Sequence, residues 1–222
     1  LQEVKVGQIW QQEIAKDFSR HTLTLNSADE YIADFEDKVM ASGKPQQAGT
    51  ATLADNETMA DAEYKFSSTH RFHEISMKDL MLMNIYLPSD GDGTVKQEDF
   101  RQTISDLSQY IEDRRGDREV IVIGDFNASK KQKKKARWQA VEAMMARHSM
   151  TATIPGFSSN YNYNHHETTI DFMLSTSGVT VHHVEGLHRH LLPGNTSTHI
   201  PVTFTVEFNT TEADTGAGDT GE

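Results

Sequence analysis

Four β-branched residues in a row, residues 120–123, run directly into Gly124, Asp125, Phe126 and Asn127. A short, uninterrupted β-branched run that ends at a glycine predicts a strand buried on both of its faces. The carboxylate of Asp125 and the amide of Asn127 follow the carboxyl end of this strand, where polar side chains can form a rigid site. Aspartate and asparagine are also common in turns, so these residues alone support a plain turn as well as a site.

The rest of the chain divides into apolar segments of strand and helix length. Apolar runs predict strands over residues 80–87, 170–174, 179–184 and 201–208, and several short strands between residues 46 and 75. Apolar residues spaced by three or four predict one helix from Thr94 to just before Gly116 and another over residues 136–147. Two more helices are expected over residues 10–18 and 28–41. Strands outnumber helices without strict alternation, so we expect a layered α/β fold with buried sheets and outer helices.

The charge of the chain constrains its partners. The formal net charge is −12, which argues against a protein that binds nucleic acid through a broadly basic surface. A local basic block nevertheless follows Asn127 and consists of Lys130, Lys131, Lys133, Lys134, Lys135 and Arg137. We interpret this block as a solvated face or, alternatively, as a contact to a phosphate backbone.

The composition is that of a globular protein. The chain has no cysteine, which excludes disulfides and thiolate metal sites, and no apolar run approaches the ~20 residues of a membrane span. We expect one domain over residues 1–208 and an acidic, disordered tail over residues 209–222, which has too few apolar residues to fold. None of six histidines has the spacing of a helical zinc site, and we expect them to be solvated: His165, His166, His182, His183, His188 and His190.

Polar residues recur at the ends of apolar runs in four distant segments. These segments are Leu1-Gln2-Glu3-Val4, Ile123-Gly124-Asp125-Phe126-Asn127, Thr169-Ile170-Asp171-Phe172 and Ser197-Thr198-His199-Ile200-Pro201-Val202. In this order, and together with Asn84-Ile85-Tyr86-Leu87-Pro88-Ser89, they resemble the endonuclease/exonuclease/phosphatase superfamily. Within that superfamily the chain most resembles the endonuclease domains of non-LTR retrotransposons.

The resemblance implies a four-layer α/β sandwich, in which helices flank two packed β-sheets and the site lies at the open edge between the sheets. It also implies phosphodiester hydrolysis by a metal-activated water. Glu3 matches the metal-binding glutamate of the family, and the expected cofactor is Mg²⁺ (or Mn²⁺), since Mg²⁺ prefers carboxylate and water oxygens.

The resemblance also implies a role for five further residues. Asp125 matches the residue that orients or deprotonates the attacking water, and Asn127 matches the amide that positions the water with the phosphate. His199 matches the histidine that hydrogen-bonds the scissile phosphate, and Asp171 the carboxylate that orients that imidazole, as the aspartate of a catalytic triad does. Tyr86 matches a tyrosine near the phosphate.

The function that these matches imply is magnesium-dependent nicking of DNA by the endonuclease domain of a retroelement. The expected partner is therefore nucleic acid, with DNA the first choice, and not a membrane. A reverse-transcriptase domain is expected in the full-length polyprotein, and the expected location is intracellular, in the nucleus for a retroelement endonuclease.

Two departures from the family pattern motivate alternatives. The last motif of the family usually reads Ser-Asp-His, whereas this chain has Thr198 before His199. The chain also starts at Leu1, after the position of the family's first strand, so we expect an N-terminally truncated domain. One alternative is a catalytically inactive relative that acts as a binding module. Another is a phosphodiesterase whose substrate is a phospholipid or a nucleotide.

Overall fold

The computed structural model describes most of the second half of the chain and several strands of the first half. The described residues are 21–26, 50–57, 60–66, 71–89, 94–131, 135–161, 167–186 and 198–210. Glu3, the helices expected over residues 10–18 and 28–41, and most of the expected tail lie outside this part of the chain.

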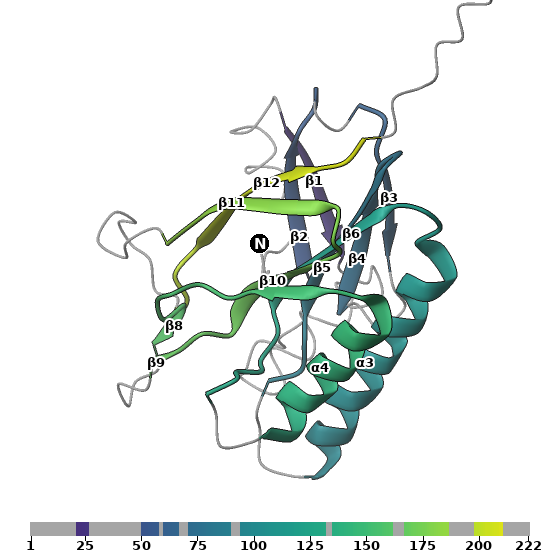
Figure 1. Cartoon of the computed structure of the whole chain (residues 1–222). Helices are drawn as coiled ribbons and strands as arrows, with labels where there is room; N and C mark the ends of the chain where they lie inside the picture. The colour runs from purple at the N-terminus through teal and green to yellow at the C-terminus, as the bar shows by residue number, and fades with distance from the viewer. Residues whose placement is uncertain are drawn as a thin grey trace, which may run out of the picture.

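A six-stranded mixed sheet forms the centre of the described structure (Figure 1). Its strands β5 and β6 are parallel, and every other neighbouring pair is antiparallel. In spatial order the strands are β3 (Glu63–Phe66), β4 (Phe72–Ser76), β5 (Leu80–Tyr86), β6 (Glu119–Asp125), β10 (Asp171–Ser175) and β7 (Thr151–Thr153). The strands predicted over residues 80–87, 120–123 and 170–174 are therefore confirmed, and they are the three neighbours at the middle of the sheet.

Two helices cover one face of this sheet (Figure 1). Helix α3 (Thr94–Arg114) is the crossover that a parallel β5–β6 pair requires, and α4 (Lys135–His148) follows β6. Both helices were predicted. The apolar stripe of α3 is at most 6% exposed and consists of Phe100, Ile104, Leu107 and Ile111. This stripe packs on the sheet with Trp138, Val141 and Met144 of α4.

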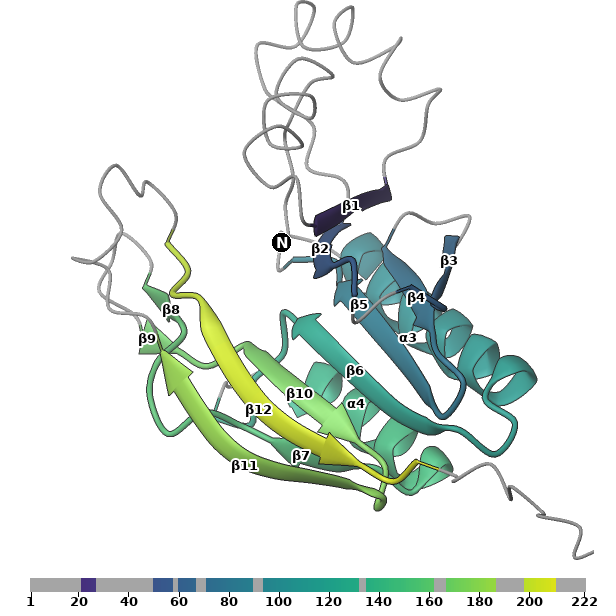
Figure 2. The same ribbon diagram turned by 90° about the horizontal axis from the view of Figure 1, so that it is seen from above.

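A hairpin covers the opposite face of the sheet (Figure 2). It consists of β11 (Val179–Gly186) and β12 (Val202–Phe208), and it packs on the sheet through Phe204, Val206 and Phe208. Side chains of β6 alternate between the two faces of the sheet: Val120 and Val122 face the helices, whereas Ile121 and Ile123 face the hairpin. The β-branched run is thus buried between two layers, as its sequence predicts, and the described residues stack as helices, sheet and hairpin.

Two short strand pairs complete the described structure. Strand β1 (His21–Asn26) pairs with β2 (Thr50–Asp55), and β8 (Asn160–Tyr161) pairs with β9 (Glu167–Thr168). Neither pair was located from the sequence beyond the short strands expected between residues 46 and 75. Among the described residues, neither helix is apolar over enough of its length to cross a lipid bilayer.

Candidate active site

Three adjacent strands place polar side chains side by side. In the register of the sheet, Asp125 of β6 lies opposite Tyr86 of β5 on one side and Asp171 of β10 on the other. The apolar residues two positions before Asp125 and two positions after Asp171 face the hairpin. Because side chains alternate along a strand, Asp125 and Asp171 project from that same face. Two residues that are 46 positions apart in the sequence thus become neighbours at one end of the sheet.

The turn after β6 fixes Asp125 and Asn127 to each other. Oδ1 of Asp125 accepts a hydrogen bond from the backbone N–H of Asn127 (2.8 Å), and Oδ2 accepts one from the Asn127 side-chain amide (3.1 Å). The same amide also donates to the carbonyl of Leu87 (2.8 Å). Asn127 has a φ of 45°, a left-handed conformation that asparagine tolerates better than most residues. The predicted turn is therefore present, and it is the device that orients both polar groups.

Phe126 fixes this turn to the neighbouring strand β10. Its ring stacks on Phe172 of β10 with a centroid distance of 3.9 Å, and its N–H donates to the carbonyl of Ile170 (2.9 Å). Phe126 and Phe172 are both at most 1% exposed. Alternation explains the result: a buried aromatic residue between Asp125 and Asn127 directs the two polar side chains away from the helical core.

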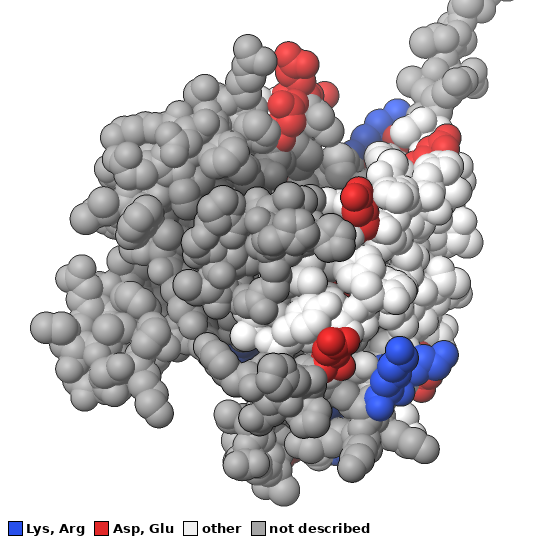
Figure 3. All heavy atoms as spheres, turned by 90° about the vertical axis from the view of Figure 1, so that its left-hand side faces the viewer, with Lys and Arg blue, Asp and Glu red and all other residues white. Residues whose placement is uncertain are grey.

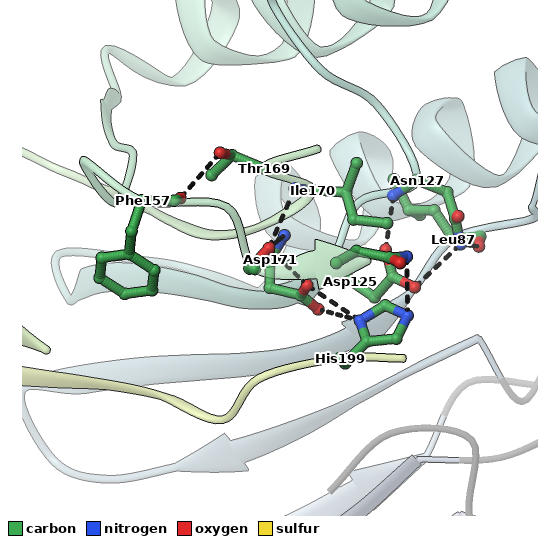
Figure 4. A network of polar contacts seen from close by, with 10 residues as sticks. Leu87, Asp125, Asn127, Phe157, Thr169, Ile170, Asp171 and His199 are labelled. Carbon is green, nitrogen blue, oxygen red and sulfur yellow. Dashed lines mark hydrogen bonds and ion pairs between the residues drawn. The ribbon is translucent and has the colours of Figure 1, made fainter. Parts of the chain in front are cut away.

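His199 is held by Asp171 (Figure 4). The Nδ1 atom of the imidazole lies 2.9 Å from Oδ2 and 3.1 Å from Oδ1 of the carboxylate. Ser159 supports the carboxylate, since its hydroxyl donates to Oδ2 of Asp171 (2.7 Å). Ser159 is fully buried, and its oxygen in turn accepts the N–H groups of Ile170 and Asp171. The imidazole is therefore oriented by a carboxylate that is itself fixed.

The other ring nitrogen of His199 contacts Asn160. The side-chain Nδ2 of Asn160 lies 3.1 Å from Nε2 of His199. The backbones of these two residues form an antiparallel bridge, in which Tyr161 donates to the carbonyl of Thr198 (2.9 Å) and Ile200 donates to the carbonyl of Ser159 (2.7 Å). With Nδ1 bonded to Asp171, the imidazole has Nε2 as its second nitrogen for a further contact, which in this structure is made to Asn160. The structure thus directs Nε2 away from the carboxylate.

The two carboxylates and the imidazole form a group with the chemistry of a cation site. One ligand atom each from Asp125, Asp171 and His199 lie within 4.8 Å of one another. Carboxylate oxygens suit Mg²⁺ and Mn²⁺, whereas an imidazole ligand is better suited to Mn²⁺ than to Mg²⁺. Because Nδ1 of His199 is bonded to Asp171, the imidazole offers only Nε2 to an ion. The donor set therefore fits a divalent cation through its carboxylates first.

The remaining residues that the sequence singled out lie in different surroundings. Tyr86 is 2% exposed, its N–H donates to the carbonyl of Arg71 (2.7 Å), and its ring lies 5.6 Å from the Arg71 guanidinium. Glu3 lies outside the described residues, so its predicted role as a metal ligand stays a prediction. Thr198 is half-buried, and its backbone carbonyl is part of the bridge that carries His199.

Three residues that support the site were not predicted to do so from the sequence. Ser159 and Asn160 lie in a polar segment without a periodic pattern, and only their cross-chain contacts reveal them. Arg137 was assigned to the basic block, but this assignment is wrong for Arg137, which is 3% exposed, with its guanidinium against backbone carbonyls. Lys130 and Lys131 of the same block are exposed, as expected.

A second buried polar cluster lies further along the hairpin-facing side of the sheet. His73 of β4 is fully buried and its Nε2 lies 2.6 Å from Oγ1 of Thr52, which also accepts from the amide of Asn84 (3.1 Å). Burial lowers the pKa of His73 to about 4, because the charged imidazole would lose its hydration. His73 is therefore neutral near pH 7 and holds β2 against β4 and β5.

Of the six histidines expected to be solvated, His182 and His183 lie among the described residues, and the other four lie outside them: His165, His166, His188 and His190. His182 and His183 are exposed on β11, where they pair with Glu207 (3.0 Å) and Glu185 (3.5 Å). On the face drawn in Figure 3, acidic and basic side chains of the described residues are interspersed and do not form one continuous basic surface. This part of the surface matches the acidic composition.

The chain matches the model of one protein family and the fold of several solved structures. The family is described as "Endonuclease-reverse transcriptase", and the match spans residues 80–203, more than half of the chain. A 3′ phosphatase from Neisseria bound to a product DNA hairpin has 16% identity and a TM-score of 0.67, with 94% of this chain and 87% of that chain covered. An AP endonuclease from Archaeoglobus fulgidus has 14% identity and a TM-score of 0.64 over 94% and 87% of the two chains.

An endonuclease/exonuclease/phosphatase protein from Bacteroides vulgatus has 15% identity and a TM-score of 0.62 over 92% of this chain and 82% of that chain. A comparison with curated proteins finds no match. At these identities the solved structures establish the fold, and the family match establishes the membership. The chain belongs to the endonuclease/exonuclease/phosphatase family, in the group described as endonuclease-reverse transcriptase.

Proposed function

We propose that this chain hydrolyses phosphodiester bonds in DNA with the help of a divalent cation. The observation that carries the proposal is the Asp171–His199 pair, fixed beside the Asp125–Asn127 turn at neighbouring strand ends. An oriented imidazole, a buried carboxylate and a fixed amide on adjacent rigid strands are the groups that in-line hydrolysis of a phosphate diester requires.

Each residue has a distinct task in the proposed reaction. Asp125 accepts a proton from the attacking water, and the side chain of Asn127 fixes the carboxylate that does so. The water oxygen forms a bond to phosphorus while the bond to the leaving oxygen breaks, and that oxygen takes a proton from solvent. His199 is oriented by Asp171 at Nδ1, and in the proposed complex its Nε2 carries a proton and donates to a phosphate oxygen, where negative charge accumulates. The phosphate therefore replaces Asn160 as the partner of Nε2.

The proposed cation is Mg²⁺ (or Mn²⁺). Glu3 is the proposed carboxylate ligand from outside the described residues, and Asp125 and Asp171 supply the nearest described carboxylate oxygens. When bound, the ion neutralises charge on the phosphate and lowers the barrier to attack by water. The contribution of the described residues is to hold the carboxylates within one small region.

The proposed substrate is DNA, and the proposed biological role is nicking of target DNA by a retroelement. The family description, which names an endonuclease together with a reverse transcriptase, supports this role and a reverse-transcriptase domain in the same polyprotein. The Neisseria 3′ phosphatase bound to a DNA hairpin and the Archaeoglobus AP endonuclease, which share the fold, support DNA as the substrate. A retroelement endonuclease would act in the nucleus.

Two observations favour rival functions. The net charge of −12 and the interspersed charges in Figure 3 favour a phosphodiester substrate other than DNA. Thr198, in place of the family's aspartate, favours a module that binds DNA without turnover. The three functions differ in substrate dependence, salt dependence and turnover, and one set of assays separates them.

The test compares two substrates under defined metal conditions. Nicking of supercoiled plasmid and hydrolysis of bis(p-nitrophenyl) phosphate are measured with Mg²⁺, with Mn²⁺ and with a chelator. The proposal predicts metal-dependent nicking, and an affinity for DNA that falls steeply as salt increases, because counterions compete for phosphate contacts. Hydrolysis of the small diester with no salt-dependent binding to DNA would favour the non-DNA substrate. Tight binding without turnover under either metal would favour the binding module.

A further inference from the structure

Arg137 is a buried cation at the start of α4, directly behind the turn that carries Asn127. It is 3% exposed, although the sequence before it is rich in lysines, of which Lys130 and Lys131 are exposed. We propose that Arg137 is a positioning residue that locks the segment after Tyr86 to the segment after Asp125, and so fixes Asn127 for catalysis. The inference rests on the proposed function, because it assigns Arg137 a role in that same site.

The guanidinium contacts three backbone carbonyls from two segments. Nη1 donates to the carbonyl of Pro88 (2.6 Å) and to that of Asn127 (3.1 Å), and Nη2 donates to the carbonyl of Ser89 (3.1 Å). Pro88 and Ser89 follow β5, whereas Asn127 follows β6. One planar group therefore ties together the ends of the two parallel strands that carry Tyr86 and Asp125.

Asn127 is held at both ends by this arrangement. Its side-chain amide donates to the carbonyl of Leu87, one residue before Pro88, and to Asp125, while its own carbonyl accepts from Arg137. The φ of 45° at Asn127 is uncommon for a residue other than glycine and persists only where surrounding contacts enforce it. Arg137 supplies one of those contacts directly on the Asn127 carbonyl.

The chemistry of the site explains why arginine is needed at this position. A guanidinium has five donors in a fixed plane, so it can reach carbonyls of both segments at once, whereas a lysine ammonium is a point donor. The guanidinium carbon of Arg137 also lies 4.5 Å from the ring centroid of Phe100 in α3, which packs against the charged group. The side chain is thus held by α3 on one side and by the two catalytic segments on the other.

A purely structural role for Arg137 predicts different behaviour from a positioning role. A structural arginine would stabilise the whole domain, and its loss would loosen the sheet and the turn together. Loss of a positioning arginine would loosen Asn127 first, because the guanidinium of Arg137 donates to the carbonyl of Asn127 and to carbonyls of the neighbouring segment. The two roles are therefore separated by comparing the turn with the centre of the sheet in the same variant.

The test uses Arg137→Met, Arg137→Ala, Arg137→Lys and, as a control, Arg147→Met in the full chain. Arg147 lies in the same helix, where it forms an exposed ion pair with Glu112, and loss of such a pair changes little. Nicking is measured for kcat and KM, and hydrogen exchange is measured by NMR at the backbone amides of Asn127 and Val122. The Asn127 amide bonds to Asp125, whereas Val122 lies at the centre of the sheet.

The proposal predicts that Arg137→Met lowers kcat by about 100-fold, the scale of a misplacement of roughly 1 Å. KM stays near the wild-type value, and exchange accelerates at Asn127 but not at Val122. Arg137→Lys recovers part of kcat, and Arg147→Met behaves as wild type. Guanidinium chloride at concentrations well below denaturing levels restores activity to Arg137→Ala, whereas sodium chloride at equal ionic strength does not.

Unchanged kcat together with unchanged exchange at Asn127 would overturn the proposal, as would equal acceleration of exchange at Asn127 and Val122. If Arg137→Met does not fold, the same comparisons are made with Arg137→Lys, and a lysine variant that matches wild type at both amides and in kcat refutes the positioning role. The exchange measurement needs no turnover. A chain that hydrolyses no DNA would therefore refute the proposed function while the exchange data still decide the role of Arg137.

Discussion

The replacement of Asp171 by asparagine tests how the site controls His199. Asp171 accepts hydrogen bonds from both the imidazole Nδ1 and the hydroxyl of Ser159. The oxygen of Ser159 already accepts two backbone N–H groups, so its hydroxyl proton must point at residue 171. An asparagine at this position therefore has to place its oxygen, and not its amide nitrogen, next to Ser159.

The expected consequence is a direct conflict at the imidazole. With the oxygen of the introduced amide fixed at the position of Oδ2, its NH₂ group takes the position of Oδ1, which lies 3.1 Å from Nδ1 of His199. The introduced NH₂ group then faces the Nδ1–H donor, and the retained oxygen, 2.9 Å from Nδ1, is a neutral and weaker acceptor. The ring either turns, which moves Nε2 away from the phosphate, or gives up its Nδ1 proton, which leaves a neutral Nε2–H donor in place of a charged one.

The rate should fall by about 100- to 1,000-fold, the loss that follows when one donor to the developing negative charge is removed. In free energy this is about 2.7–4 kcal/mol of transition-state stabilisation. The assay is single-turnover nicking of supercoiled plasmid, with the tautomer of His199 followed by ¹⁵N NMR. Asp113→Asn on the exposed surface of α3 is the matched control. A rate for Asp171→Asn within a few-fold of wild type, with the tautomer unchanged, would refute the reasoning.

Three further predictions concern the scaffold that holds the site. The free energy of unfolding should fall by about 3 kcal/mol as pH decreases from 6.5 to about 4, because the unfolded chain protonates His73 in this range while the folded chain does not. Urea titrations of wild type and His73→Gln measure this loss, and an equal pH dependence in both proteins would contradict the prediction. Glu74→Gln should lower the free energy of unfolding by about 3 kcal/mol, because the fully buried carboxylate of Glu74 pairs with Nε of Arg114 (2.8 Å) and Nη1 of Arg118 (3.2 Å). A urea midpoint equal to that of wild type would count against this prediction. Phe172→Ala should cost about 3–5 kcal/mol and reduce nicking further than stability alone explains, because it removes the ring on which Phe126 stacks; thermal unfolding and nicking well below the melting temperature check both parts.

Much of the fold was predictable because its signals are local. The run at residues 120–123 specifies a strand buried on both faces, and a four-residue spacing places Phe100 and Ile104 on one side of α3. Asp125 and His199 were selected by family resemblance, and the structure brings them together with Asp171. These predictions did not depend on knowing which distant segments meet.

The supporting residues of the site could not be predicted, because contacts between distant segments define them. Ser159 supports Asp171 across 12 positions, and no periodicity marks it. Arg137 follows a run of lysines that indicates solvent exposure, but it donates to the carbonyl of Pro88, 49 positions away, and is buried. A hydrogen bond between segments so distant leaves no pattern in either segment, so the supporting residues of the site were found only in the structure.

Asp125, at the buried end of β6, is the residue on which the proposed hydrolytic site depends. The decisive measurement is the nicking rate of Asp125→Ala beside wild type, with Mg²⁺ and supercoiled plasmid, and with Asp113→Ala as the control. We predict that wild type and Asp113→Ala nick at similar rates and that Asp125→Ala loses at least about 1,000-fold, the scale on which loss of a catalytic carboxylate acts. Equal nicking by Asp125→Ala and wild type would contradict the account.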